Sequence, residues 1–148
     1  MKAFREFGLL VIVAHWGVVV WHLLLVAKVL PSFTTQQITL VIGSLTLAHL
    51  VVFLAWWIRP NRFGGLLLLV FLTVALAAGI YEHFLSSGPN NVFRIAPGQW
   101  TTAFQASVAM LPPLELSGIW LGIRTLRHRP KDNRHAVGRG FRSFRHQQ

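Results

Sequence analysis

The chain of 148 residues contains no cysteine and few charged residues. The absence of cysteine excludes disulfides, thiolate zinc sites, cysteine-ligated iron–sulfur clusters and cysteine nucleophiles. Charged residues make up 12% of the chain, whereas an average soluble domain carries roughly a quarter. So few charges cannot cover the surface of a globular protein in water, and we therefore do not expect a soluble enzyme. The apolar share of 53% also argues against a chain that is disordered throughout.

The apolar residues fall into four runs, each close to the roughly 20 residues that a helix needs to cross a bilayer. We expect membrane spans at about residues 8–30, 35–58, 63–85 and 100–123. The fourth run is the least regular, because it contains two prolines and a glutamate. The expected fold class is an all-α membrane protein in which residues 1–126 form an antiparallel bundle of four transmembrane helices.

The basic residues predict the orientation of this bundle. Twelve of the 14 Lys and Arg residues precede the first run, join the second run to the third, or follow the fourth. Lys28 and Arg94 are the two that fall in the other connections. By the positive-inside rule, this distribution predicts a multi-pass protein of the bacterial cytoplasmic (inner) membrane with both termini in the cytoplasm.

The last segment, residues 127–148, is rich in Arg, His and Gly and has too few apolar residues to build a core. We expect a disordered cytoplasmic tail that binds anionic lipid headgroups, each base contributing on the order of 1 kcal/mol near the membrane surface. Binding to nucleic acid is not expected, because Phe141 and Phe144 are the only aromatic residues among these bases.

Three ionisable residues in separate spans lie at nearly one depth. Counted from the predicted cytoplasmic end of each span at about 1.5 Å per residue, His15 lies roughly 10 Å, His49 roughly 13 Å and Glu115 roughly 12 Å into the membrane. Ionisable groups inside a span are costly and indicate a functional site when they face the bundle interior. We call these three residues the polar layer.

Two sequence features lie beside the polar layer. His22 follows His15 by seven residues, so both project from one face of their helix. Gly118 and Gly122 follow Glu115 at +3 and +7 and form a Gly-x-x-x-Gly stripe, which lets another helix approach this face closely. Glu115 is therefore expected in a contact between helices, away from lipid.

The predicted outer side carries one concentrated patch of ionisable residues at the end of the third run and in the loop that follows. We name these residues the outer patch: Tyr81, Glu82, His83 and Arg94. Near the predicted ends of spans, tryptophan side chains are expected to anchor the bundle at the headgroup region; these are Trp56, Trp57, Trp100 and Trp120.

Three interpretations of the polar layer stay open. The side chains hydrogen-bond across the bundle and fix the helix register, or His15 and His49 hold haem b, with His22 as a candidate ligand ranked after them. The third interpretation is a transition-metal or proton site. We expect a non-enzymatic accessory or anchor subunit that associates with other membrane subunits or with copies of itself. A haem b electron-transfer subunit and a small transporter or proton-conducting module are the alternatives.

Overall fold

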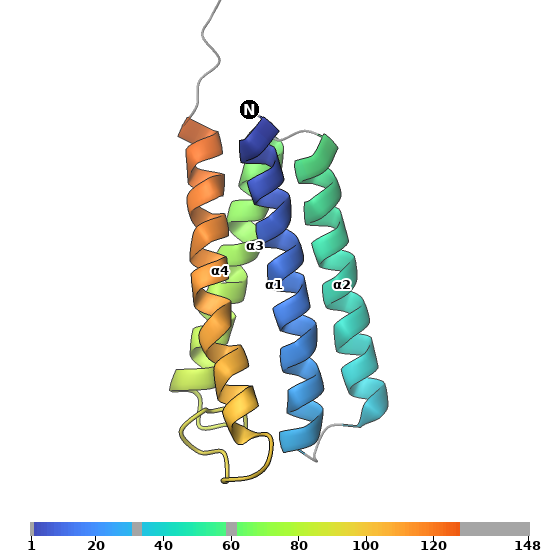
Figure 1. Cartoon of the computed structure of the whole chain (residues 1–148), viewed down its shortest axis with the longest axis vertical. Coiled ribbons are helices and arrows are strands. Elements are labelled where there is room, and N and C mark those ends of the chain that lie inside the picture. The colour runs from blue at the N-terminus through green and yellow to red at the C-terminus, as the bar shows by residue number, and fades with distance from the viewer. Residues whose placement is uncertain (1, 31–33, 59–61, 128–148) are drawn as a thin grey trace, which may run out of the picture.

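The computed structural model describes residues 2–30, 34–58 and 62–127. Figure 1 shows long helices lying side by side, with no strand in the described residues. The start of α1 and the end of α4 lie at the same end of the molecule (Figure 1). The elements are α1 (Lys2–Val29), α2 (Thr35–Ile58), α3 (Arg62–Ile80), the π-helical turn η1 (Tyr81–Leu85) and α4 (Thr101–Arg127).

Each of the four stretches, with η1 continuing α3, is long and apolar enough to cross a membrane. The prediction of an all-helical protein with four membrane-length helices is thus confirmed. The helices extend past the predicted spans at the end where α1 begins, because α1 starts at Lys2 and α4 continues to Arg127. Apart from Arg127, the predicted tail lies outside the described residues.

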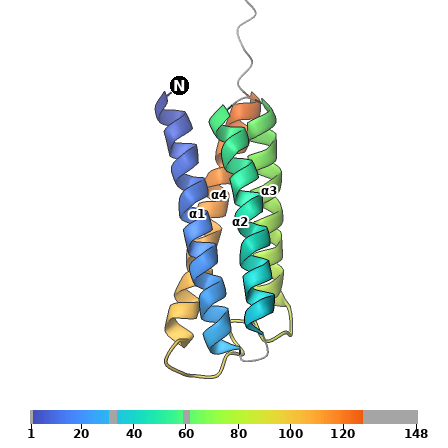
Figure 2. The same ribbon diagram turned by 90° about the vertical axis from the view of Figure 1, so that its right-hand side faces the viewer.

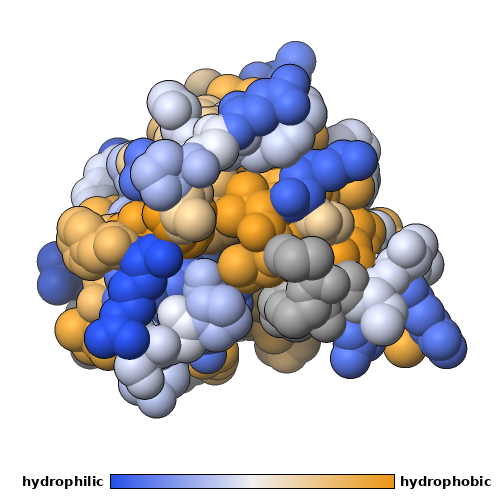
Figure 3. Space-filling view, turned by 90° about the horizontal axis from the view of Figure 1, so that it is seen from below, coloured by the Kyte–Doolittle hydropathy of each residue, from blue (hydrophilic) through white to orange (hydrophobic). Residues whose placement is uncertain are grey.

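Large apolar side chains cover the outside of the bundle, and examples with at least 60% of their surface exposed occur on α1, α2 and α3: Leu10, Leu47 and Val74. In water such a surface would be strongly unfavourable, whereas lipid tails can cover it. Seen from the end that carries the α1–α2 connection, hydrophilic residues surround an apolar centre (Figure 3).

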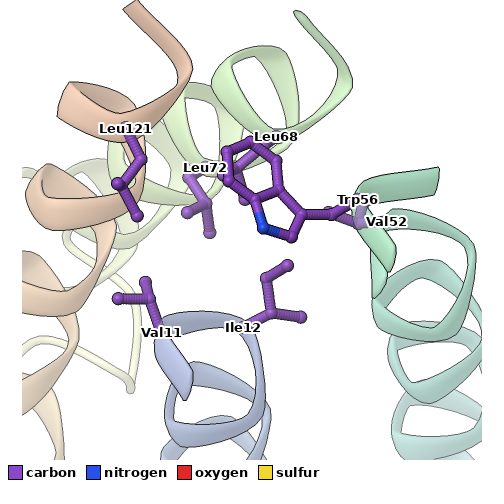
Figure 4. Close-up of a cluster of buried hydrophobic side chains, with 7 residues drawn as sticks. All are labelled: Val11, Ile12, Val52, Trp56, Leu68, Leu72 and Leu121. Carbon is purple, nitrogen blue, oxygen red and sulfur yellow. The ribbon is translucent and has the colours of Figure 1, made fainter. Parts of the chain in front are cut away.

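The core at the end where α1 begins is a cluster to which all four helices contribute (Figure 4). Its buried members are Val11, Ile12, Val52, Trp56, Leu68, Leu72 and Leu121. The indole of Trp56 points into the space between the helices and is fully buried (Figure 4). A second cluster lies toward the opposite end and contains Leu25, Val26, Leu30, Phe104 and Val108.

The position of Trp56 corrects its predicted role as an interfacial anchor. Its indole N–H donates to the backbone oxygen of Arg5 at 3.0 Å, which satisfies the donor inside the protein. Gly8 makes this packing feasible, because a Cβ at that position would overlap the indole ring. The other predicted anchors, Trp57, Trp100 and Trp120, are each at least 42% exposed, as the headgroup region requires.

The closest helix packing is that between α3 and α4. A Cβ at Gly122 would lie 2.8 Å from the backbone oxygen of Gly65 and 3.1 Å from the Cα of Leu69. The Gly-x-x-x-Gly stripe of α4 is therefore occupied by α3 of the same chain, and this pairing turns Glu115 toward the interior. The least extensive of the main packings is that between α2 and α3.

Candidate functional site

The polar layer is a continuous hydrogen-bonded chain across three helices. The imidazole of His15 on α1 lies between the other two members: its Nδ1 is 2.9 Å from His49 Nε2 on α2, and its Nε2 is 3.3 Å from Glu115 Oε1 on α4. All three side chains are buried, with at most 4% of each residue exposed. The structure thus brings together the three residues whose depths matched in the sequence.

The positions of the protons in this hydrogen-bonded chain follow from the bond at its His49 end. His49 Nδ1 lies 2.7 Å from the backbone oxygen of Leu45, which can only accept, so Nδ1 carries a proton. In a neutral His49 ring Nε2 is then the acceptor, and His15 Nδ1 must donate to it. The last link, between His15 Nε2 and Glu115 Oε1, therefore contains one proton. That proton resides either on Glu115, with both groups neutral, or on His15, as a buried ion pair.

Phe71 on α3 lies beside the two imidazoles of the polar layer. Its ring lies edge-on to both imidazoles, at centroid distances of 6.2 Å from His15 and 4.9 Å from His49. An apolar ring in this place lowers the local polarity, which strengthens the electrostatic part of the hydrogen bonds. All four helices therefore contribute to the layer, three with polar groups and one with an aromatic wall.

His22 belongs to a second cluster, which the sequence did not reveal. Its Nδ1 lies 2.9 Å from Ser107 Oγ on α4, and its ring centroid is 4.8 Å from that of His83. Phe104 packs against both imidazoles, at 5.0 and 6.0 Å. We call His22, His83 and Ser107 the second histidine cluster. Ser107 gave no signal in the sequence, because a serine in an apolar helix usually bonds to its own backbone.

The residues of the outer patch lie in two different environments in the structure. Tyr81 and Glu82 are exposed, and Arg94 is exposed with its Nη1 3.2 Å from the backbone oxygen of Ser87. His83, in contrast, is 7% exposed and faces His22 in the interior. The π-helical turn explains the difference, because its wider winding rotates the side chains away from the positions that an α-helix would give them.

No group of three or more His, Cys, Asp or Glu side chains in the described ranges 2–30, 34–58 and 62–127 is arranged to hold a metal ion. In the polar layer, the direct bond between His15 and His49 occupies the nitrogens that face each other. Haem b between these residues would need both rings to give up this bond in order to ligate its iron.

Comparisons with known proteins give no family for this chain: no family model, no curated protein and no solved structure matches it.

Proposed function

We propose that the chain is a multi-pass protein of the bacterial cytoplasmic membrane, with antiparallel helices and both termini in the cytoplasm. The twelve-to-two distribution of bases between the two sides supports this orientation. The start of α1 and the end of α4 lie at one end of the bundle (Figure 2), which is compatible with both termini on one side.

Reporter fusions test the topology. A reporter fused after Gln148 and one inserted at Asn61 should both be active in the cytoplasm, whereas one inserted at Asn90 should be active outside. The reason is that the basic connections resist translocation. An external reporter at Gln148 would contradict the proposed number and orientation of the spans.

Within that topology, the function we favour is that of a non-enzymatic accessory subunit that packs against another membrane protein. The observation that carries this proposal is Trp21 on α1, which is 38% exposed. Trp21 lies about 8 Å from the midpoint of the 28-residue helix, counted at about 1.5 Å per residue. This position falls within a hydrocarbon core about 30 Å thick.

The indole of Trp21 would meet lipid tails at this depth in an isolated chain. Trp16, five residues earlier and 39% exposed, donates its indole N–H to Thr46 Oγ1 at 3.1 Å. Trp21 makes no hydrogen bond to any residue that the structure describes. Tryptophan prefers the headgroup region, and an unsatisfied donor among lipid tails is costly. A neighbouring subunit that covers this face and accepts the hydrogen bond would remove the penalty.

Site-specific photocrosslinking tests the accessory role. A benzophenone amino acid at position 21 should give one discrete adduct with another membrane protein when native membranes are irradiated. Position 74 on α3 is the matched control, because Val74 is 63% exposed near the middle of the span Arg62–Leu85. Lipid adducts alone at both positions would contradict the proposal, and a self-adduct at position 21 would indicate a homo-oligomer instead.

The second candidate function is a proton-conducting module, which is favoured by the two hydrogen-bonded clusters. His15 and His22 both lie on the interior face of α1, about 10 Å apart along the helix. Together the clusters place protonatable groups in both halves of the bundle. Proton flux into liposomes that contain the chain, abolished in His22→Phe, would favour this function over the accessory role.

Haem b remains the alternative cofactor prediction for His15 and His49, and the visible spectrum of the purified chain tests it. A Soret band that disappears in His49→Ala would support the electron-transfer alternative.

The predicted binding of anionic lipid by residues 127–148 is tested by deletion of Lys131–Gln148, which should weaken salt-sensitive binding to anionic vesicles and leave the bundle folded.

A further inference from the structure

A hollow of about 500 Å³ lies between α1, α2 and α3 beside the second histidine cluster. Its wall is largely apolar and includes Val19, Leu23, Val41, Leu45 and Ala78. Val41 and Ala78 are exposed, so the hollow opens at the apolar flank between α2 and α3. A lipophilic molecule could therefore enter from the bilayer. The volume falls within the range of roughly 300–1,000 Å³ that small-molecule sites occupy.

The polar residues of the wall gather toward the end of the bundle that carries the α1–α2 connection. They come from α1, α2, η1 and the loop that follows it: His22, Gln37, Glu82, His83 and Asn90. The π-helical turn supplies two of the five, and such turns occur frequently at functional sites. An apolar wall with a few polar groups at one end is typical of a pocket that binds a small molecule and orients it.

The hydrogen bonds of the two histidines leave an acceptor on each ring. Ser107 donates its hydroxyl proton to the backbone oxygen of Phe104 at 2.6 Å, so His22 Nδ1 must donate to Ser107 Oγ. His83 Nδ1 donates to the backbone oxygen of Asn90 at 3.1 Å. In the neutral rings both Nε2 atoms are therefore acceptors, and neither bonds to a residue within the described ranges.

A third acceptor belongs to Asn90. Its Oδ1 is buried and has no hydrogen-bond partner among the described residues. Buried polar atoms are nearly always satisfied, so this oxygen needs a donor. Gln37, whose Oε1 already accepts the backbone N–H and the hydroxyl of Thr34, adds an amide donor at the rim. The described residues of the wall include no Lys or Arg, and a phosphate or carboxylate group would therefore find no counter-charge among them.

We propose that this hollow binds a membrane-soluble hydroquinone, a quinol whose ring hydroxyls donate to the imidazoles of His22 and His83. The two imidazole acceptors, which belong to rings in contact with one another, match the two hydroxyl donors of a quinol. The absence of Lys and Arg among the described residues of the wall matches its neutral ring, and the apolar wall matches its lipophilic tail. The oxidised quinone has no hydroxyl to donate, so the reduced form binds more tightly. The site is formed by one chain and does not depend on the accessory role.

Binding of tritiated decylubiquinol to the purified full chain in detergent, kept anaerobic, tests this proposal. We expect saturable binding about thirtyfold tighter than that of decylubiquinone, since each of the two hydrogen bonds should contribute about fivefold. His22→Phe and His83→Phe each preserve an aromatic ring and remove an acceptor. Each should weaken quinol binding by roughly five- to tenfold and leave quinone binding unchanged.

Gly79 allows a test that does not depend on the histidines. A Cβ at Gly79, which lines the hollow, would meet no atom within 4 Å, so Gly79→Leu has room to place its side chain in the hollow. Gly17 on α1 has the same free space and does not line the hollow, which makes Gly17→Leu the matched control. Gly79→Leu should abolish saturable binding, and Gly17→Leu should retain it.

Three results would overturn the proposal. The first is the absence of saturable quinol binding to the wild-type chain. The second is quinol binding that survives in Gly79→Leu. The third is equal affinity for decylubiquinol, decylubiquinone and decanol, which would identify the hollow as a nonspecific site for apolar chains.

Discussion

Replacing His15 with alanine should lower the free energy of unfolding by roughly 2–4 kcal/mol, more than the same change at His49. His15 is the middle member of the polar layer and bonds to both His49 and Glu115. Its removal leaves two buried polar groups without partners, whereas loss of His49 leaves one. Equilibrium unfolding in mixed detergent micelles measures the difference between the two variants.

A double-mutant cycle with Glu115→Gln isolates the coupling. The introduced amide can donate to His15 Nε2 and carries no charge, so His15→Ala should cost less in the Glu115→Gln variant than in the native chain. We expect a coupling of about 1–2 kcal/mol between His15 and Glu115, toward the upper end for hydrogen bonds between membrane helices. The coupling between His49 and Glu115 should be smaller, because these two side chains do not bond to each other and interact only through His15. Zero coupling for both pairs would contradict the hydrogen-bonded chain.

The second large effect is expected at the contact between α3 and α4. Gly122→Val should destabilise the bundle by roughly 3 kcal/mol or more, at or above the upper end for overpacked cores. The new side chain would meet the Gly65 oxygen and the Leu69 backbone, and backbone atoms cannot rotate away as a flexible side chain can. Thermal unfolding in detergent measures the loss of stability.

Gly17→Val is the matched control for this experiment. It introduces the same side chain into a helix at a position where a Cβ meets nothing within 4 Å, so it reports the helix-propensity change alone. Equal destabilisation by the two substitutions would mean that Gly122 does not hold α3 and α4 together.

Much of this architecture can be predicted from periodicity and counting. An apolar run of about 20 residues has few stable structures besides a membrane-length helix, and the four runs correspond to the four membrane-length helices in the described part of the chain. The depths of His15, His49 and Glu115 follow from a fixed rise per residue. The structure indeed brings these three side chains into one hydrogen-bonded chain.

Trp56 and His83 show where such counting fails. The position of a residue along a helix does not fix the direction in which its side chain points around the helix axis. That direction decides whether a tryptophan near a helix end contacts headgroups or the core. Trp56 enters the core because Gly8, 48 positions earlier in the chain, leaves room for its ring. His83 turns inward because η1 winds as a π-helix. The residue spacing of a regular α-helix does not predict this change in side-chain direction.

The number of helices, their lengths and the level at which ionisable groups lie can be read from the sequence, because these depend on local composition and on the constant rise of a helix. Which of these groups meet depends on how the helices pack. The packing places His15 between its two partners, because α1 packs against both α2 and α4, and it pairs His22 with Ser107 and His83 beside the hollow. These pairings depend on the rotation of each helix about its axis, which is set by close packing between residues distant in the chain.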